Sequence, residues 1–168
     1  SILTSALTTK EKLLTKEANE RGKESQILYM LSSKLSDASD IEAVLKIAAE
    51  SISHLLQINV GCIYIGRQSA PIYIQQSGKE QIHRGLPDVE EIRKKYTDLR
   101  TEYLEEEDTY GYPVNGREHL LAVVKIDKTV NAEQLQEKKK LLHSIIENVS
   151  MAMERIEVTV ERVRDREN

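Results

Sequence analysis

The residues that could carry out chemistry are few and widely spaced. The four histidines, His54, His83, His119 and His143, have no ligand spacing with one another or with the single cysteine, Cys62. A zinc site needs closely spaced cysteine or histidine ligands. No glycine-rich loop of the G-x-x-x-x-G-K-[ST] or G-x-G-x-x-G type occurs to hold a phosphate. The sequence therefore predicts no metal site, requires no cofactor, and contains no nucleophile with an assignable base.

Three other polar features have ordinary explanations. The acidic run from Glu105 to Asp108 could bind a cation, but such runs are more often a solvated loop. Cys62 lies in the apolar run NVGCIYIG, as a small buried side chain in a reducing compartment would. His54 lies in SHLL, which faintly resembles a kinase phosphoacceptor box. A phosphoacceptor box has an acidic residue directly after its histidine and a proline further on. The stretch directly after His54 has neither, so we expect His54 to lie in a packed helix.

Composition favours one soluble domain with an extension. The 168 residues are 39% hydrophobic and 31% charged, without Trp or Phe, so aliphatic side chains must form the core. The net charge is −4, and acids alternate with bases, which argues against binding to nucleic acid. No apolar run approaches the ~18 residues of a membrane span, and we expect a cytosolic chain. The initial Ser1 and the absence of a helix stop near Asn168 suggest a segment of a longer protein.

The first half of the chain predicts two helices. Leu7, Leu14, Leu28 and Leu35 recur every seven residues in a long amphipathic stretch, whose apolar stripe is narrow before Gly22. A narrow stripe is typical of a solvated helix or a thin coiled coil. Residues 1–26 are therefore expected to be a helical linker, with the domain beginning at residue 27. Asp40 is a good N-cap for a second helix, over 41–57.

The second half predicts two hairpins and two helices. NVGCIYIG and PIYIQQ form one hairpin, and YPVNGREHLLAVVKID forms the other, with a turn at Asn115-Gly116. Residues 77–88 read as a loop, and a helix is expected from Pro87 to Tyr103. Asn131 should N-cap the last helix, with Gln134 in a capping box. Apolar residues on both faces of 120–124 predict an α+β fold, an antiparallel sheet covered by helices on both sides.

The last helix carries a regular apolar seam. Seven apolar residues follow one another along the chain at alternating intervals of four and three residues. They are Leu142, Ile146, Val149, Met153, Ile156, Val160 and Val163. After Met153 only this narrow seam remains, which is typical of a helix that pairs with another helix. We therefore expect a parallel homodimer whose exit helix begins at 154 and runs to 168. The alternative is a frayed, monomeric helix end.

Four stretches of the chain share a packing pattern with a known family: the initial LT stretch, ILYMLSSKLS, DIEAVL with the strand after it, and an ALER-like element at Ala152 to Arg155. With these elements the chain resembles the cytoplasmic segment of KdpD-type osmosensitive potassium-channel sensor histidine kinases. Residues 77–111 match least. The resemblance implies a GAF-like domain over 27–153. It also implies a cytoplasmic position in a membrane-anchored bacterial protein, adjoining membrane and kinase modules, and a response regulator reached through the kinase core.

The resemblance implies a non-catalytic sensor or relay domain, because the kinase boxes would lie outside this chain. A second possibility is a small-molecule-binding GAF domain of another regulator, such as a transcriptional activator or a cyclase. In that case Tyr64 is the first candidate ligand residue, with His119 and Lys125 as companions, although packing or solvated surface explains each equally simply. A third is an enzyme that reduces oxidised methionine, which one buried Cys62 supports poorly.

Overall fold

The chain folds into one six-stranded sheet and five helices among the residues that the structure describes. The computed structural model describes the backbone of residues 2–67, 71–77, 79–84 and 88–167, and the side chains of 8–67, 71–74 and 88–166. The elements in chain order are α1 (Ile2–Asp37), α2 (Ile41–Leu56), β1 (Val60–Tyr64), β2 (Ile72–Ser77), β3 (Lys79–Arg84), α3 (Val89–Thr97), β4 (Leu104–Glu105), β5 (Thr109–Asn115), β6 (Leu120–Asp127), α4 (Ala132–Glu137) and α5 (Lys139–Glu167).

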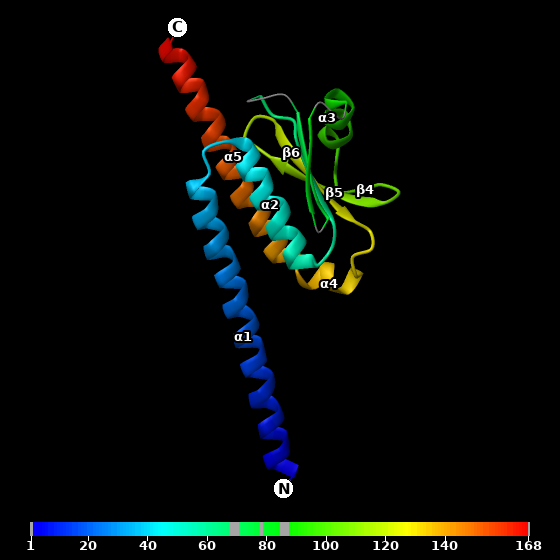
Figure 1. Ribbon diagram of the computed structural model, residues 1–168. Helices are drawn as coiled ribbons and strands as arrows, with labels where there is room; N and C mark the ends of the chain where they lie inside the picture. The colour runs from blue at the N-terminus through cyan, green and yellow to red at the C-terminus, as the bar shows by residue number, and fades with distance from the viewer. Residues whose placement is uncertain (1, 68–70, 78, 85–87, 168) are drawn as a thin grey trace.

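The sheet is antiparallel throughout, in the order β3-β2-β1-β6-β5-β4. The two predicted hairpins are β1–β2 and β5–β6, and β1 pairs with β6 to join them at the centre. Helices α2 and α5 cover one face, α1 packs on the outside of these two helices, and α3 covers the other face (Figure 1). The predicted α+β architecture, with helices on both sides of an antiparallel sheet, is confirmed.

Helix α2 forms because its two ends are capped and one face is apolar. The Asp40 side chain accepts a hydrogen bond from the Ala43 N–H at 2.8 Å, as predicted for an N-cap. At the other end Gln57 takes the left-handed conformation, with φ of 55°, and ends the helix. The buried face carries Val44, Ile52 and their neighbours against the sheet.

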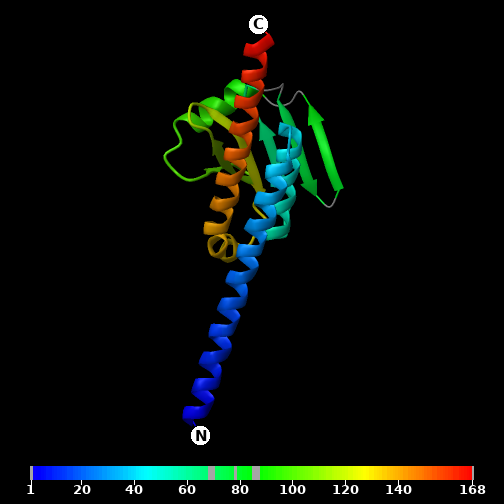
Figure 2. The ribbon, with the colours of Figure 1, turned by 90° about the vertical axis from the view of Figure 1, so that its left-hand side faces the viewer.

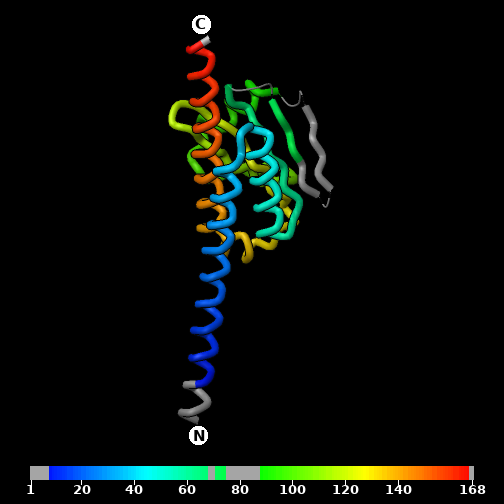
Figure 3. Tube along the Cα trace, turned by 60° about the vertical axis from the view of Figure 1, so that its left-hand side comes forward, coloured from blue at the N-terminus to red at the C-terminus, as the bar shows by residue number. Residues whose placement is uncertain are grey.

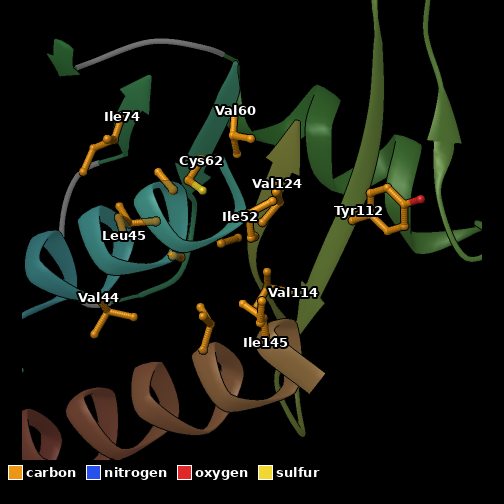
Figure 4. Packing of buried hydrophobic residues seen from close by; sticks show 14 of the residues in the cluster. Val44, Leu45, Ile52, Val60, Cys62, Ile74, Tyr112, Val114, Val124 and Ile145 are labelled. Carbon is orange, nitrogen blue, oxygen red and sulfur yellow. The ribbon is translucent and has the colours of Figure 1, made fainter. Parts of the chain in front are cut away.

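The main core lies between α2, α5 and the inner face of the sheet. Ile52 of α2, Val114 of β5 and Ile145 of α5 are fully buried and point toward one another (Figure 4). Most of this core is aliphatic, with Tyr64 and Tyr112 as its aromatic members, so its stability rests mainly on burial area and close packing. On the opposite face of the sheet a smaller cluster joins Ile63 and Val123 to Ile92 and the α3 ring of Tyr96.

Several predicted element boundaries are wrong for local reasons. Residues 79–84, expected as loop, form the edge strand β3, because pairing with β2 overrides the weak strand propensity of their polar side chains. Helix α3 ends at Thr97, not at Tyr103, and Asp88 is its N-cap; Pro87 lies outside the described residues. Asn131 caps the short helix α4 and not the last helix, because a break at Lys138 separates α4 from α5; it accepts from the Glu133 N–H rather than from Gln134.

Helices α1 and α5 run side by side in the same direction and extend past the sheet at opposite ends (Figures 2 and 3). Side chains 8–23 of α1 are exposed, and burial begins at Ile27, Leu28 and Leu31. At the other end burial continues to Ile156 and Glu157, slightly beyond the expected boundary at residue 153. The exposed part of α5 thus begins after Glu157.

The predicted dimer seam is mostly occupied by the chain itself. Leu142, Val149, Met153 and Ile156 are buried in the main core. Ile146 and Val160 are half-buried, and Val163 is exposed. The seven-residue spacing of the four buried members is therefore explained by packing within one chain, and they are not available to a partner. Dimerisation itself stays a prediction.

Two methionines of α5 provide a matched test of this packing. Met153 is fully buried, whereas Met151 is 61% exposed. We expect Met153→Ala to lower the free energy of unfolding by about 2–5 kcal/mol through cavity formation. Met151→Ala should change it by less than about 0.5 kcal/mol. Urea denaturation at two protein concentrations checks both values. A Met153→Ala effect that vanished on dilution would mean that this side chain packs against a second copy.

Candidate functional site

One buried carboxylate stands out among the described residues. Glu157 of α5 is 6% exposed, and no other charged residue in the described part of the chain is as buried. The Tyr64 hydroxyl donates to Glu157 Oε1 at 2.5 Å, and the Arg67 backbone N–H donates to the same oxygen at 3.0 Å. His119 Nε2 lies 3.2 Å from Glu157 Oε2. A buried carboxyl group is costly unless it is hydrogen-bonded, and the Tyr64 hydroxyl and the Arg67 N–H both donate to Oε1. His119 is close to the other oxygen, but the two do not form a hydrogen bond.

Three elements bring these groups together. Tyr64 ends β1, on the sheet face that α5 covers, and is fully buried. Gly66 lies two residues later, and a side chain there would collide with Glu157 Oε1 and the Tyr64 hydroxyl. A side chain at this position would therefore displace the contact between Glu157 and Tyr64. His119 precedes β6, in the β5–β6 turn closed by the Gly116 N–H bond to the His119 carbonyl.

The same side of α5 makes further polar contacts with the β5–β6 turn. The Ser150 hydroxyl donates to the Asn115 carbonyl at 2.5 Å, and the Arg117 N–H donates to Glu154 Oε1. Ser150, Glu154 and Glu157 follow one another at four and three residues, so they lie on one helix face. This face of the helix, with Glu157 at its end, attaches α5 to the sheet.

The opposite side of α5 is attached to the end of α1. Arg155 Nη2 donates to the carbonyl of Leu35 at 2.9 Å and to that of Ala38 at 3.0 Å. The last carbonyls of a helix lack partners within the helix, and a cation there is favoured by the helix dipole. Asn148 of α5 also contacts the hydroxyl of Ser32. One short length of α5 therefore contacts both the sheet and the end of α1.

An open groove of about 600 Å³ lies over this part of α5. It is bounded by Arg67, by the turn residues 117–119, and by α5 from Met151 to Arg162. Its lining mixes acids, arginines and the exposed Met151 and Val158, so it favours neither an anion nor a cation clearly.

The structure brings together two of the three predicted site residues. Tyr64 and His119 both contact Glu157. Lys125 does not join them: it lies opposite Gly111 on the α3 side of the sheet and pairs with Glu106 at 3.5 Å. Neighbouring residues of a strand face opposite sides, and Lys125 falls one step from the buried Val124 and Ile126. Lys125 therefore does not share a site with Tyr64 and His119.

Glu157 is the residue that the sequence reasoning missed. It follows Ile145, Val149 and Met153 at intervals of four, so it continues a row of side chains that proves to be buried. An acid on the apolar side of a helix is unusual unless it has buried partners. That irregularity was the available signal, although the partners themselves are far away in the sequence.

The remaining chemical candidates are separate from this site. His54 is exposed on α2, and His143 lies 3.6 Å from Glu102; the side chain of His83 lies outside the described residues. In the acidic run, Glu105 and Glu106 pair with Lys128 and Lys125, which gives part of the run an intramolecular role. Among the described residues, no three His, Cys, Asp or Glu side chains are placed to hold a metal ion.

The sheet order, the helices on its two faces and the long terminal helices define a GAF-like fold. The chain is similar to the GAF domain of the potassium sensor histidine kinase KdpD from Escherichia coli. The TM-score is 0.60 at 15% identity, over 83% of this chain and 99% of that one. It is also similar to the GAF domain of an Acinetobacter phosphoenolpyruvate-protein phosphotransferase, with a TM-score of 0.51 at 10% identity, over 81% and 95% of the two chains.

A third similar structure is the N-acylhomoserine lactone dependent LuxR family transcription factor CepR2 from Burkholderia cenocepacia. Its TM-score is 0.51 at 13% identity, over 80% of this chain and 97% of that one. No protein-family model and no curated protein matches the sequence. In the described part of the chain, none of the helices combines the length and the hydropathy needed to cross a membrane.

Removing the Tyr64 hydroxyl should measurably weaken the attachment of α5 to the sheet. Tyr64→Phe leaves Glu157 buried with one donor fewer, and a hydrogen bond to a charged group contributes about 1.5–3 kcal/mol to stability. We expect a loss of that size in urea denaturation, and a non-additive double-mutant cycle with Glu157→Gln. Tyr29→Phe, at a 76% exposed tyrosine, is the control. Equal effects of Tyr64→Phe and Tyr29→Phe would contradict the contact.

Cys62 should be chemically inert in the folded protein. Burial raises the pKa of its thiol from 9.0 to about 12, so the thiol stays protonated through pH 9. We expect no reaction with a thiol reagent between pH 7 and 9, and full reaction after unfolding in urea. Because the unfolded thiol ionises first, this residue also lowers stability as the pH rises above about 9. Rapid labelling of the native protein at pH 8 would contradict this burial.

Proposed function

We propose that this chain is a cytoplasmic sensor or relay domain of a membrane-anchored, potassium-responsive sensor histidine kinase. In this role it is non-catalytic and passes a signal along α5, as part of a parallel homodimer, to a kinase core elsewhere in the protein. The response regulator would be reached only through that core. The GAF-like fold and its occurrence in the KdpD sensor support the proposal, together with the sequence pattern of the terminal segments.

The observation that carries the proposal is the double attachment of α5. Arg155 attaches α5 to the end of the incoming helix α1, and Glu157, two residues later, attaches it to the sheet. A displacement of α1 or of the sheet would therefore act on the same turn of the exit helix. Small helix shifts between two packed arrangements are a known means of signal transmission.

The groove over Glu157 favours a second function, a small-molecule-binding domain of another regulator. Its volume of about 600 Å³ is within the range of ligand sites. Native mass spectrometry of freshly purified protein distinguishes the two functions, because a retained ligand lost on Glu157→Gln would favour the second.

The proposal predicts a specific effect of Arg155→Ala in the whole encoded protein. Loss of the contact between Arg155 and α1 should shift the balance of ATP-dependent histidine phosphorylation and dephosphorylation severalfold, and reduce its response to potassium. The measurement is autophosphorylation in membrane vesicles at low and high potassium. Arg93→Ala is the matched control, because Arg93 of α3 also donates to a backbone carbonyl, that of Ile65, but does not touch α5.

Two outcomes of this experiment would contradict the proposal. A protein that forms no phosphohistidine under any condition is not a histidine kinase. A kinase that responds to potassium identically in the wild type and in Arg155→Ala does not receive its signal through the α1–α5 attachment.

A further inference from the structure

The outward face of α5 carries three rows of side chains with a seven-residue spacing. The middle row is apolar: Met151 and Val158 are 61% and 44% exposed. An acidic row, Glu147, Glu154 and Glu161, lies on one side of it. A basic row, Arg155 and Arg162, lies on the other. At 3.6 residues per turn, positions i+3 and i+4 from Met151 fall on opposite sides of it, which separates the two charges.

This face is distinct from the seam predicted from the sequence. Leu142, Val149, Met153 and Ile156 point into the core, so Met151 and Val158 point away from it. Helix α1 packs on the outside of α2 and α5, and beside its contact with α1 the outward side of α5 is open (Figure 2). The groove described above includes both Met151 and Val158 in its lining.

The arrangement of charges selects one partner geometry. When two copies of α5 face each other in parallel around a two-fold axis along the helices, the acidic row of each copy faces the basic row of the other. Glu154 of one copy and Arg155 of the other then lie at nearly the same position along the helix axis. The same holds for Glu161 of one copy and Arg162 of the other. An antiparallel two-fold pair would instead oppose acids with acids. Charges that flank an apolar row set the orientation of helix pairs in this way.

We propose that the outward face of α5 is a parallel, two-fold interface with a second copy of this chain, centred on Met151 and Val158. This inference rests on the proposed relay function and identifies its partner surface. Isologous contacts require a self-complementary patch, and the three rows provide one. With only two apolar side chains per copy, the interface is weak and salt-dependent, because exposed ion pairs contribute little and are screened.

Part of the flanking charge is already used within the chain. Arg155 donates to the two carbonyls of α1, and Glu154 accepts from the Arg117 N–H. Glu161 and Arg162 are both exposed on the part of α5 beyond the sheet. They are therefore the pair whose exchange tests the interface without disturbing the fold.

Charge exchange at this pair has a distinctive expected result. Glu161→Arg and Arg162→Glu each place like charges opposite each other in the homodimer, and each should weaken self-association at least threefold in sedimentation equilibrium at low salt. An equimolar mixture of the two variants restores opposite charges, and should associate at least as strongly as the wild type. Association unchanged in both single variants, or a mixture no stronger than either variant alone, would overturn the proposal.

Disulfide formation distinguishes this interface from other modes of pairing. Met151→Cys and Val158→Cys should each cross-link efficiently to their own copy under mild oxidation, which only a parallel pair in register allows at both positions. The native Cys62 is buried and does not compete. Glu133→Cys, exposed on α4, is the background control, and Val163→Cys tests the seam predicted from the sequence.

The failure of this inference differs from the failure of the proposed function. Cross-linking at Val163→Cys alone would overturn the Met151–Val158 interface while leaving a dimeric exit helix, and with it the relay. Cross-linking at background level in all variants would overturn the interface and also the dimeric relay. Potassium-dependent phosphorylation of the whole protein, measured separately, would then still identify it as a sensor kinase.

Discussion

The structure depends on the packing of the inner face of α5 against the rest of its own chain. Leu142, Val149 and Met153 fill the space between α2, the inner face of the sheet and α1. Since interiors are close-packed, a helix held in this way cannot rotate freely without repacking its neighbours. The orientation of every other side chain on α5, including those that face the polar site and the solvent, follows from this one constraint.

Because the inner face of α5 is fixed in this way, the buried Glu157 always faces the sheet and can attach the end of the helix to it. One turn of α5 beyond Met153, a carboxyl group takes the place of an apolar side chain. The Tyr64 hydroxyl and the Arg67 N–H donate to it, and His119 lies 3.2 Å away. Polar contacts of this kind contribute less to net stability than apolar burial, but they are directional and leave a costly unpaired group when broken. The end of α5 is thus attached in a manner that favours defined positions over continuous sliding.

Much of the fold could be predicted because it depends on local patterns. The Asp40 cap, the two hairpins and the apolar residues on both faces of β6 are readable from the spacing of residue types, and all were found. Strand β3 was missed because its pairing with β2, not its polar composition, makes it a strand. Tyr64 and His119 were named as candidates, but their common partner Glu157 lies 93 residues beyond Tyr64.

The sequence by itself determined the long helices, the two hairpins, the largely aliphatic core and the seven-residue periodicity of α5, because these depend on residue type and spacing. Only the tertiary structure decided what that periodicity is for. A repeat of seven is equally suited to a neighbouring helix of the same chain and to a helix of a second copy, since both present the same apolar surface. Packing against α1, α2 and the sheet takes the predicted seam into the core as far as Ile156, and leaves Met151 and Val158 facing outward.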